Sequence, residues 1–427
     1  MVVSRGQLAL GLLIALSGSA SAQEAVAPTL APSASVTAAL PVTAVAPVAV
    51  GPTVLAPNVL APNIPAPTLP EPTVRGRLVI VAGGDVSFGR EAGRALLDDP
   101  TYQPLRGLEP LWAGADVRFV NLESQLTDLG GETQSPYDRL VFAGPPAAAA
   151  SLSAAGVHVV STANNHAWDY GKSALLETLL HLDRAGIRHS GTGATLEEAE
   201  RPALLEVNGW KIALFAVTRI WNQGEFQRHP GRANVAWADH RRLAARMAAA
   251  REQNDLVFVS LHTGAEYVNA PAEATVELTQ QLMRAGADAI FGHHPHVIQG
   301  VAWSGERPVF YSLGNLVFGS RRGYPWTRYG MLARLEFQAD GARAVSICPF
   351  RIEIGSHEPR VLDGRYGGYD RARFRRHFEL VNGIVGKTAV SAADDYGCTQ
   401  IAPASALPRP SPAVPPLNLA ATARTED

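Results

Sequence analysis

The chain has 427 residues and a formal net charge of −2, so it lacks the basic excess that is typical of a nucleic-acid-binding protein. Only two cysteines occur, Cys348 and Cys398, which excludes a metal site built from several thiolates. These two residues are either bonded to each other or separate thiols, and sequence spacing does not decide between the two states.

The first 22 residues have the three-part layout of a secretory signal. Arg5 precedes the apolar run Leu8–Leu16, and Ala20-Ser21-Ala22 offers a small-residue cleavage pattern. The run is shorter than the about 20 apolar residues that a membrane-spanning helix needs. We therefore expect a protein that is exported to the periplasm, the cell surface or the medium, with an uncleaved membrane anchor as the alternative.

Residues 23–74 are rich in Ala, Pro, Val and Thr, and we expect them to form a disordered or extended linker. Residues 402–427 have the same character and are expected to be a disordered tail. The segment between them, 75–401, is long enough for one large folded domain or two small ones.

Within this segment, apolar runs that predict strands alternate with stretches of helical spacing. The expected strands are Arg77–Ala82, Asp116–Val120, Val157–Ser161, Leu256–Leu261, Ala289–Phe291 and Val309–Tyr311. The expected helices are Glu91–Asp98, Pro145–Ala155, Ser173–Ala185, a helix capped by Asp239 that runs through Ala250, and Ala272–Ala285. Asn208-Gly209 and Asp340-Gly341 predict two hairpins. The mixture indicates an α/β fold in which two sheets pack together and helices lie outside.

Polar residues with metal-binding or acid/base chemistry follow several of these strands. Asp85 comes after the first strand and Glu123 after the second, each at a place where a turn carboxylate would be the ordinary alternative. Because the carboxyl ends of strands in an α/β sheet meet at one crevice, such residues are expected to converge.

The cluster Asn164-Asn165-His166 separates a strand from a long helix. Asp169 lies three residues after His166, at a spacing that suits a carboxylate orienting an imidazole. A helix N-cap would explain one asparagine, but it does not explain the whole cluster.

Two histidine-containing motifs follow later strands. His262 ends a Val-rich strand, with Glu266 four residues further on, and taken alone it would be an ordinary core histidine. His293-His294-Pro295-His296 places three histidines in four residues. In an extended segment, which Pro295 favours for the residue before it, His294 and His296 would point the same way. Carboxylate, amide and imidazole ligands together suit Mn, Fe or Zn.

Taken in order, these motifs resemble the CapA family, the poly-γ-glutamate capsule biosynthesis proteins that are related to calcineurin-like metallophosphoesterases. The resemblance covers about Leu78 to Val317. It implies a four-layer α/β/β/α sandwich of the metallophosphoesterase type and a divalent metal centre. The residues that match metal-ligand positions are Asp85, Glu123, Asn165, His262, His294 and His296. His166 matches the catalytic histidine with Asp169 beside it, and Asn121, Glu266 and His293 are assigned to substrate binding.

One departure from the pattern affects the expected number of metal ions. Phosphoesterases usually open with Asp-x-His, whereas Ser87 occupies the histidine position here. We therefore expect one tightly held ion and a weaker second one.

The motifs support two functions. The first is an exported metal-dependent hydrolase, phosphoesterase-like, that acts on a phosphoester or an anionic polymer in capsule biosynthesis. The second is a non-catalytic surface component of a capsule export complex that binds the polymer, with Arg219, Arg321, Arg322 and Arg328 as candidate contacts. In both cases membrane proteins of capsule synthesis are the expected partners, and nucleic acid is not.

Overall fold

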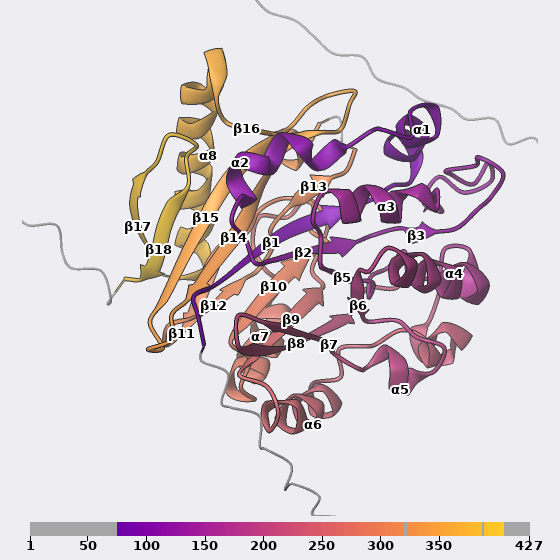
Figure 1. Ribbon diagram of the computed structural model, residues 1–427, viewed down its shortest axis with the longest axis horizontal. Coiled ribbons are helices and arrows are strands. Elements are labelled where there is room, and N and C mark those ends of the chain that lie inside the picture. Colours follow the sequence, from indigo (N-terminus) through magenta and orange to yellow (C-terminus); the bar gives the residue numbers. More distant parts are fainter. Residues whose placement is uncertain (1–74, 320–322, 387, 405–427) are drawn as a thin grey trace, which may run out of the picture. The chain divides into compact units, whose positions relative to one another are not determined.

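Two β-sheets form the framework of the folded part of the chain (Figure 1). The computed structural model describes residues 75–319, 323–386 and 388–404. The predicted signal segment and linker, 1–74, lie outside the described residues, as does the tail from 405 onward. The last strand of the domain extends to Pro403, two residues past the boundary expected at 401.

The first sheet has the strand order β17-β18-β15-β14-β1-β2-β5-β6, with β13 paired to β1 and β16 to β15. Its central strands β1, β2, β5 and β6 are parallel, and β14 runs antiparallel to β1. The strands span Leu78–Val86 (β1), Val117–Leu122 (β2), Val159–Ser161 (β5), Arg188–Ser190 (β6), Asn315–Val317 (β13), Tyr329–Phe337 (β14), Arg343–Ile352 (β15), Pro359–Val361 (β16), Thr388–Ala393 (β17) and Thr399–Pro403 (β18).

The second sheet has the order β11-β12-β10-β9-β8-β7. Its strands span Ala203–Val207 (β7), Trp210–Thr218 (β8), Leu256–His262 (β9), Ala289–His293 (β10), Val301–Ser304 (β11) and Arg307–Phe310 (β12). A short pair, β3 (Gln125–Leu126) and β4 (Ala143–Gly144), stands apart from both sheets.

The helices span Arg90–Asp98 (α1), Glu109–Trp112 (α2), Ala147–Ala154 (α3), Gly171–Arg184 (α4), Leu196–Ala199 (α5), His240–Arg251 (α6), Glu273–Arg284 (α7) and Gly364–Val385 (α8). Four 3-10 turns cover Pro104–Leu108 (η1), Phe226–Arg228 (η2), Pro230–Ala233 (η3) and Pro325–Arg328 (η4). No helix of the described residues is long and apolar enough to cross a membrane.

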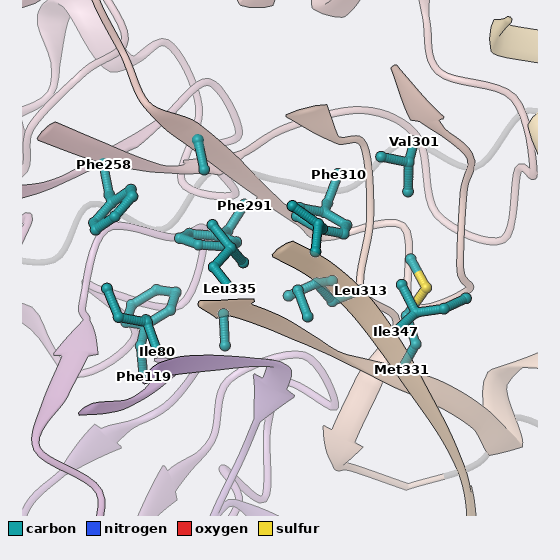
Figure 2. Close-up of a cluster of buried hydrophobic side chains, with 14 of the residues drawn as sticks. Ile80, Phe119, Phe258, Phe291, Val301, Phe310, Leu313, Met331, Leu335 and Ile347 are labelled. Carbon is teal, nitrogen blue, oxygen red and sulfur yellow. The ribbon is translucent and has the colours of Figure 1, made fainter. Parts of the chain in front are cut away.

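The alternation of side chains along the strands divides the core into layers. Ile80 of β1 and Phe258 of β9 belong to one buried cluster that fills the space between the two sheets, and Phe119, Phe291 and Leu335 join them there (Figure 2). The neighbouring residues along these strands point to the outer faces of the sheets. Many of them are valines, so the outer faces are apolar as well.

The outer face of the first sheet packs on helices through Val79 and Val81, which share a cluster with Leu96 of α1 and Leu152 of α3. The outer face of the second sheet packs in the same way, since Val257 and Val259 cluster with Leu243 and Met247 of α6 and Leu282 of α7. The layers are therefore stacked in the order helices, first sheet, second sheet, helices. The predicted four-layer α/β/β/α arrangement is confirmed.

The predicted elements agree with most of the observed ones. Both hairpins are present, and Asn208 and Gly209 adopt φ values of 50° and 79°, as a type I′ turn requires. The side chain of Asp239 caps α6 by accepting bonds from the amides of Arg241 and Arg242. The sequence analysis missed α8, the long helix before the last two strands.

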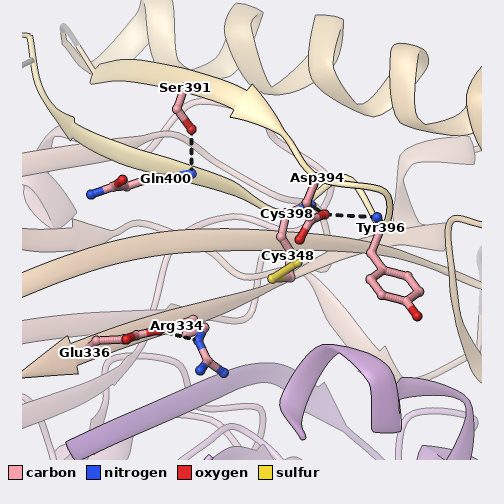
Figure 3. The surroundings of a disulfide bond; sticks show 8 residues. All are labelled: Arg334, Glu336, Cys348, Ser391, Asp394, Tyr396, Cys398 and Gln400. Carbon is pink, nitrogen blue, oxygen red and sulfur yellow. Dashed lines mark hydrogen bonds and ion pairs between the residues drawn. A yellow bond between two sulfur atoms is a disulfide. The ribbon is translucent and has the colours of Figure 1, made fainter. Parts of the chain in front are cut away.

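The two cysteines form a disulfide that ties β15 to the start of β18 across 50 residues of chain (Figure 3). The turn before Cys398 is fixed by Asp394, whose Oδ1 accepts bonds from the amides of Tyr396 and Cys398 at 2.9 and 2.8 Å. Of the two states that the sequence left open, the structure has the bonded one.

Candidate metal centre

The carboxyl ends of β1 and β2 and the start of β13, three neighbouring strands of the first sheet, bring polar side chains together. Asp85 of β1 lies opposite Asn121 of β2 on one side and Asn315 of β13 on the other. Glu123 follows β2 directly. A glycine makes this packing feasible, since a Cβ on Gly84 would lie 1.8 Å from the carbonyl oxygen of Gly314.

The second sheet contributes histidines at the same end. His262, the last residue of β9, pairs in register with His293, the last residue of β10. The two sheets meet here, because Nδ1 of His293 lies 3.1 Å from Oδ1 of Asp85. Residues from β1, β2, β9 and β10 therefore share one buried site, as the strand-end argument predicted.

Asp85 is the best-connected carboxylate of this site. Its Oδ1 accepts a bond from Asn121 Nδ2 at 2.9 Å, and its Oδ2 accepts one from the His294 amide at 3.1 Å. Burial would raise the pKa of Asp85, but the hydrogen bond and charge of His293 outweigh it, and the pKa lies well below its usual range. Asp85 is thus an anion fixed in position.

Glu123 lies in the same site without such support. Its side chain is fully buried, and neither carboxylate oxygen has a hydrogen-bond partner. The nearest basic atoms are His262 Nε2 at 3.6 Å and His296 Nε2 at 3.9 Å. Burial, followed by the charge of Asp85, raises the pKa of Glu123 well above its usual range. A buried carboxylate with free oxygens is costly unless a cation compensates it.

Three imidazoles border this carboxylate. His262 Nε2 lies 2.7 Å from Asn165 Oδ1, His296 Nδ1 lies 2.8 Å from Asn315 Oδ1, and His294 Nδ1 is buried with no partner. Burial lowers the pKa of all three, with help from the neighbouring His294 charge for His262 and the His296 charge for His294, whose pKa falls to about 4. Neutral imidazoles are the form that binds metal ions.

The geometry fits a metal ion. Three overlapping groups of side chains could each hold an ion, because within each group the ligand atoms lie within 4.8 Å of one another. The groups are Glu123 with His262 and His294, Asp85 with Glu123 and His296, and Glu266 with His294 and His296. The free oxygens of Glu123 and the free Nδ1 of His294 are the donor atoms that such an ion would use. Oxygen and imidazole donors suit the divalent ions Mn, Fe or Zn. Five of the six expected ligands therefore lie in these groups, and Asn165 touches His262.

His166 lies beside this cluster, and its ring is fixed by Asp169. His166 Nδ1 is 2.8 Å from Asp169 Oδ2. The same carboxylate accepts bonds from the Phe142 amide at 3.0 Å and from Gln223 Nε2 at 3.2 Å. This arrangement leaves His166 Nε2 as the free ring nitrogen. The pairing was expected from the i, i+3 spacing, whereas the contributions of Phe142 and Gln223 have no local sequence signal.

The backbone of the histidine motif differs from the expectation. His294 and His296 have φ values of 96° and 57°, in the left-handed region, and are not extended. The prediction that Pro295 holds an extended segment is therefore wrong. Backbone strain of this kind costs about 1–3 kcal/mol per residue and persists where surrounding contacts enforce it. Here the His294 amide bond to Asp85 is one such contact.

Asn121 and His293, which were expected to bind substrate, lie deep in the site. Both side chains are fully buried and both hydrogen-bond Asp85, and their role in substrate binding stays a prediction. Glu266 is exposed and lies within ligand distance of His294 and His296. Ser87, at the position where phosphoesterases have histidine, uses its hydroxyl to accept a bond from the Gly89 amide at 3.2 Å.

A pocket of about 580 Å³ opens over the cluster. His166, Glu266 and His296 form part of its lining, so the exposed side of the candidate site is here. Arg90 and Arg139 also line it, and the sequence analysis missed both of them. Of the arginines that it proposed instead, Arg328 points its Nε at the Ile352 carbonyl, and Arg321 and Arg322 lie outside the described residues.

Comparisons with known proteins agree with the motifs. Residues 79–320 match the family model of the bacterial capsule synthesis protein PGA_cap. The PGA biosynthesis protein CapA of Bacillus subtilis is 27% identical over 281 residues, which cover 66% of this chain and 73% of that protein. The capsule biosynthesis protein CapA of Bacillus anthracis is 26% identical over 287 residues, covering 66% and 69%.

Among solved structures, the NAD nucleotidase of Haemophilus influenzae matches with a TM-score of 0.37 and 16% identity. The match covers 64% of this chain and 56% of the nucleotidase chain, so it spans a little over half of that protein.

Proposed function

The chain belongs to the PGA_cap family of bacterial capsule synthesis proteins, and on this premise we propose that it is an exported protein of capsule or poly-γ-glutamate synthesis with a metal-dependent hydrolase site. The observation that carries the proposal is the buried carboxylate of Glu123, whose two oxygens lack hydrogen-bond partners among three neutral imidazoles. A site that was only structural would satisfy these atoms within the protein.

Asp85, Glu123, Asn165, His262, His294 and His296 would hold the ion, and Glu266 is within reach of two of them. When bound, a divalent cation polarises a scissile ester or amide group and lowers the pKa of water beside it. Asn121 and His293 keep Asp85 in place, and Asn315 orients His296. Ser87 stands where phosphoesterases have a histidine ligand, and its hydroxyl accepts a bond from the Gly89 amide. We therefore propose one tightly held ion and a weaker second one.

His166 would supply the proton chemistry. Asp169 holds the Nδ1 side of the ring, which leaves Nε2, on a residue that lines the pocket, to donate a proton to the leaving group. Phe142 and Gln223 also bond the Asp169 carboxylate and hold it in place. The orientation of the His166 ring therefore does not depend on the metal ligands.

The place of action is part of the same proposal. The signal-like segment with Arg5, Leu8–Leu16 and Ala20-Ser21-Ala22 directs the chain out of the cytoplasm. The Cys348–Cys398 disulfide supports an oxidising compartment, where such bonds persist. Anionic polymer or phosphoester is the proposed substrate, and membrane proteins of capsule synthesis are the proposed partners.

The test of this proposal is the metal content of the purified full chain, measured by elemental analysis, together with turnover of a generic phosphodiester and of a γ-linked glutamate oligomer. We expect about one tightly held divalent ion per chain and turnover of at least one substrate that His166→Ala lowers. A chain that binds no divalent ion tightly would contradict the proposal. Metal-independent binding of the oligomer without turnover of either substrate would instead identify a polymer-binding component.

A further inference from the structure

We propose that Arg90, with Arg139 beside it, forms a subsite in the pocket over the metal centre that binds a second oxyanion of the substrate, a carboxylate or a phosphate, away from the scissile bond. This inference rests on the proposed function only in taking the pocket beside His166 as the substrate site. Neither arginine belongs to the motifs that mark the metal centre.

Arg90 lies at the start of α1 in a conformation that few side chains adopt. Its φ is 57°, in the left-handed region, and the residue is locked there by two bonds to Thr133. The Arg90 amide donates to the Thr133 carbonyl at 3.0 Å, and the Thr133 hydroxyl donates to the Arg90 carbonyl at 3.1 Å. Strained backbone that is held on both sides is found preferentially where a side chain has to be aimed.

The guanidinium of Arg90 is fixed as firmly as its backbone. It stacks over the Phe142 ring at 4.5 Å, and its Nη2 donates to the Arg139 carbonyl at 2.8 Å. The Phe142 ring is in turn 4.2 Å from the His166 ring, so the positive charge is held one ring away from the proposed proton donor. Gly89 makes room for this stack, since a Cβ there would lie 2.3 Å from the Phe142 ring.

Arg90 has no counter-ion among the described residues, whereas several other partly buried arginines of the fold are paired. Arg118 pairs with Glu109, Arg251 with Asp288 and Arg351 with Asp370. Within the described part of the chain, no ion pair includes Arg90 or Arg139, and Nε of Arg90 is buried without a partner. Glu91 and Glu266 also line this pocket, so the attraction for an anion is local to the two guanidinium groups, which would bind it through charge-assisted bonds.

The chemistry of the subsite follows from its donors. A guanidinium is planar and matches the two oxygens of a carboxylate or phosphate, and the stacked ring keeps it pre-organised. Arg139 is exposed on the loop before Phe142, and its carbonyl also accepts a bond from Gln134 at 2.8 Å, which ties that loop to the pocket. The pocket therefore favours a substrate with at least two anionic groups, one at the metal centre and one at Arg90.

The test compares Arg90→Met with Arg94→Met in the full-length purified protein. Arg94 is exposed on the same helix and does not line the pocket, so this control removes the same charge from the same helix. Calorimetric titration with inorganic phosphate and with a γ-linked glutamate oligomer measures affinity without turnover. Elemental analysis and thermal unfolding of each variant verify that the metal centre and the fold are intact.

We expect Arg90→Met to weaken binding of the oxyanion roughly tenfold to hundredfold, the range for a lost charge-assisted contact. Arg94→Met should have less than a threefold effect, and Arg139→Met, whose side chain does not take part in the Phe142 stack, should fall between the two. Loss for phosphate alone identifies a phosphate subsite, and loss for the oligomer alone identifies a carboxylate subsite.

Equal affinities of Arg90→Met and Arg94→Met for both probes would overturn the inference. If Arg90→Met unfolds, Arg139→Met decides in its place, and wild-type affinity in that variant would overturn the inference as well. These measurements need no turnover. If the protein hydrolyses neither substrate but its affinity still depends on Arg90, the hydrolase proposal fails and the subsite proposal stands.

Discussion

Replacing Glu123 by methionine should stabilise the metal-free protein and destabilise the metal-loaded protein. In the metal-free protein this side chain is a fully buried carboxyl group with two unpartnered oxygens next to Asp85. Methionine has a similar volume and no polar atom, so it relieves both the unmet hydrogen bonds and the repulsion. At about 1–3 kcal/mol for an unsatisfied buried polar group, we expect Glu123→Met to stabilise the metal-free fold by about 2 kcal/mol.

With metal present the order should invert. An ion that binds only the folded state stabilises it by about 4 kcal/mol at a thousandfold excess over its dissociation constant. The wild type receives this increment, and Glu123→Met loses most of it because two of the three potential metal groups include Glu123. The wild type should then be more stable by about 2 kcal/mol, which is the difference between these two estimates.

The assay is urea unfolding of both proteins after chelation and after reloading with Mn or Zn. Glu266→Gln is the matched control, because this carboxylate borders the same histidines but is exposed, so its replacement should leave the metal-free protein within about 0.5 kcal/mol of the wild type. The reasoning is refuted if Glu123→Met destabilises the metal-free protein, or if it gains as much from metal as the wild type does.

Four further predictions concern other parts of the molecule. His166→Ala and Asp169→Asn should both lower turnover at least tenfold, while elemental analysis finds the metal content of the wild type, because neither residue belongs to the potential ligand groups. Replacing Cys348 and Cys398 by serine should cost about 4 kcal/mol in urea unfolding, the chain-entropy value for a loop of 50 residues, and a loss below 1 kcal/mol would contradict it. His377 is buried against Trp326, and burial, with the charge of Arg373, lowers its pKa to about 4. The folded state therefore binds this proton less readily than the unfolded chain, so stability present above pH 6.5 should fall as the pH is lowered toward 4, and His377→Gln should flatten that slope in urea unfolding. Cell fractionation should find the mature protein outside the cytoplasm; full-length soluble protein in the cytoplasm would contradict the signal segment.

The sequence predicted those parts of the fold that depend on local periodicity and turn chemistry. Continuous apolar runs identified β1 and β9, and Asn208-Gly209 identified the β7–β8 hairpin. Helix α8 was missed although its buried positions, Phe374, Phe378 and Val381, have the i, i+4, i+7 spacing of one helix face. Four glycines within it, at positions 364, 367, 368 and 383, weaken the helical signal.

The sequence predicted which residues form the candidate site, but it did not predict the hydrogen bonds among them. Ligand-type residues after strands converge because parallel strands of both sheets end at the same edge, so Asp85, Glu123 and His262 could be grouped without knowing any distance. Whether a group member faces a substrate or supports a neighbour depends on the depth of the side chain. Asn121 and His293 are fully buried and bond Asp85, and no local sequence signal predicted these contacts.

The left-handed turn at His294 shows why the histidine motif could not be interpreted from spacing alone. In an extended segment the two residues flanking Pro295 would project on one side, and the His294 amide would be free to pair along a strand edge. In the structure the chain turns at both histidines, and the amide of His294 binds Asp85 across the junction of the two sheets. The turn thus uses a backbone donor of the second sheet to hold the carboxylate of the first, and it places two imidazoles within ligand distance of Glu266. Histidine, unlike glycine, does not adopt this conformation freely, so the tertiary contacts must stabilise it. Relieving the strain with His294→Gly would therefore keep the turn and remove one ligand, whereas Asp85→Asn would weaken the contact that enforces the turn.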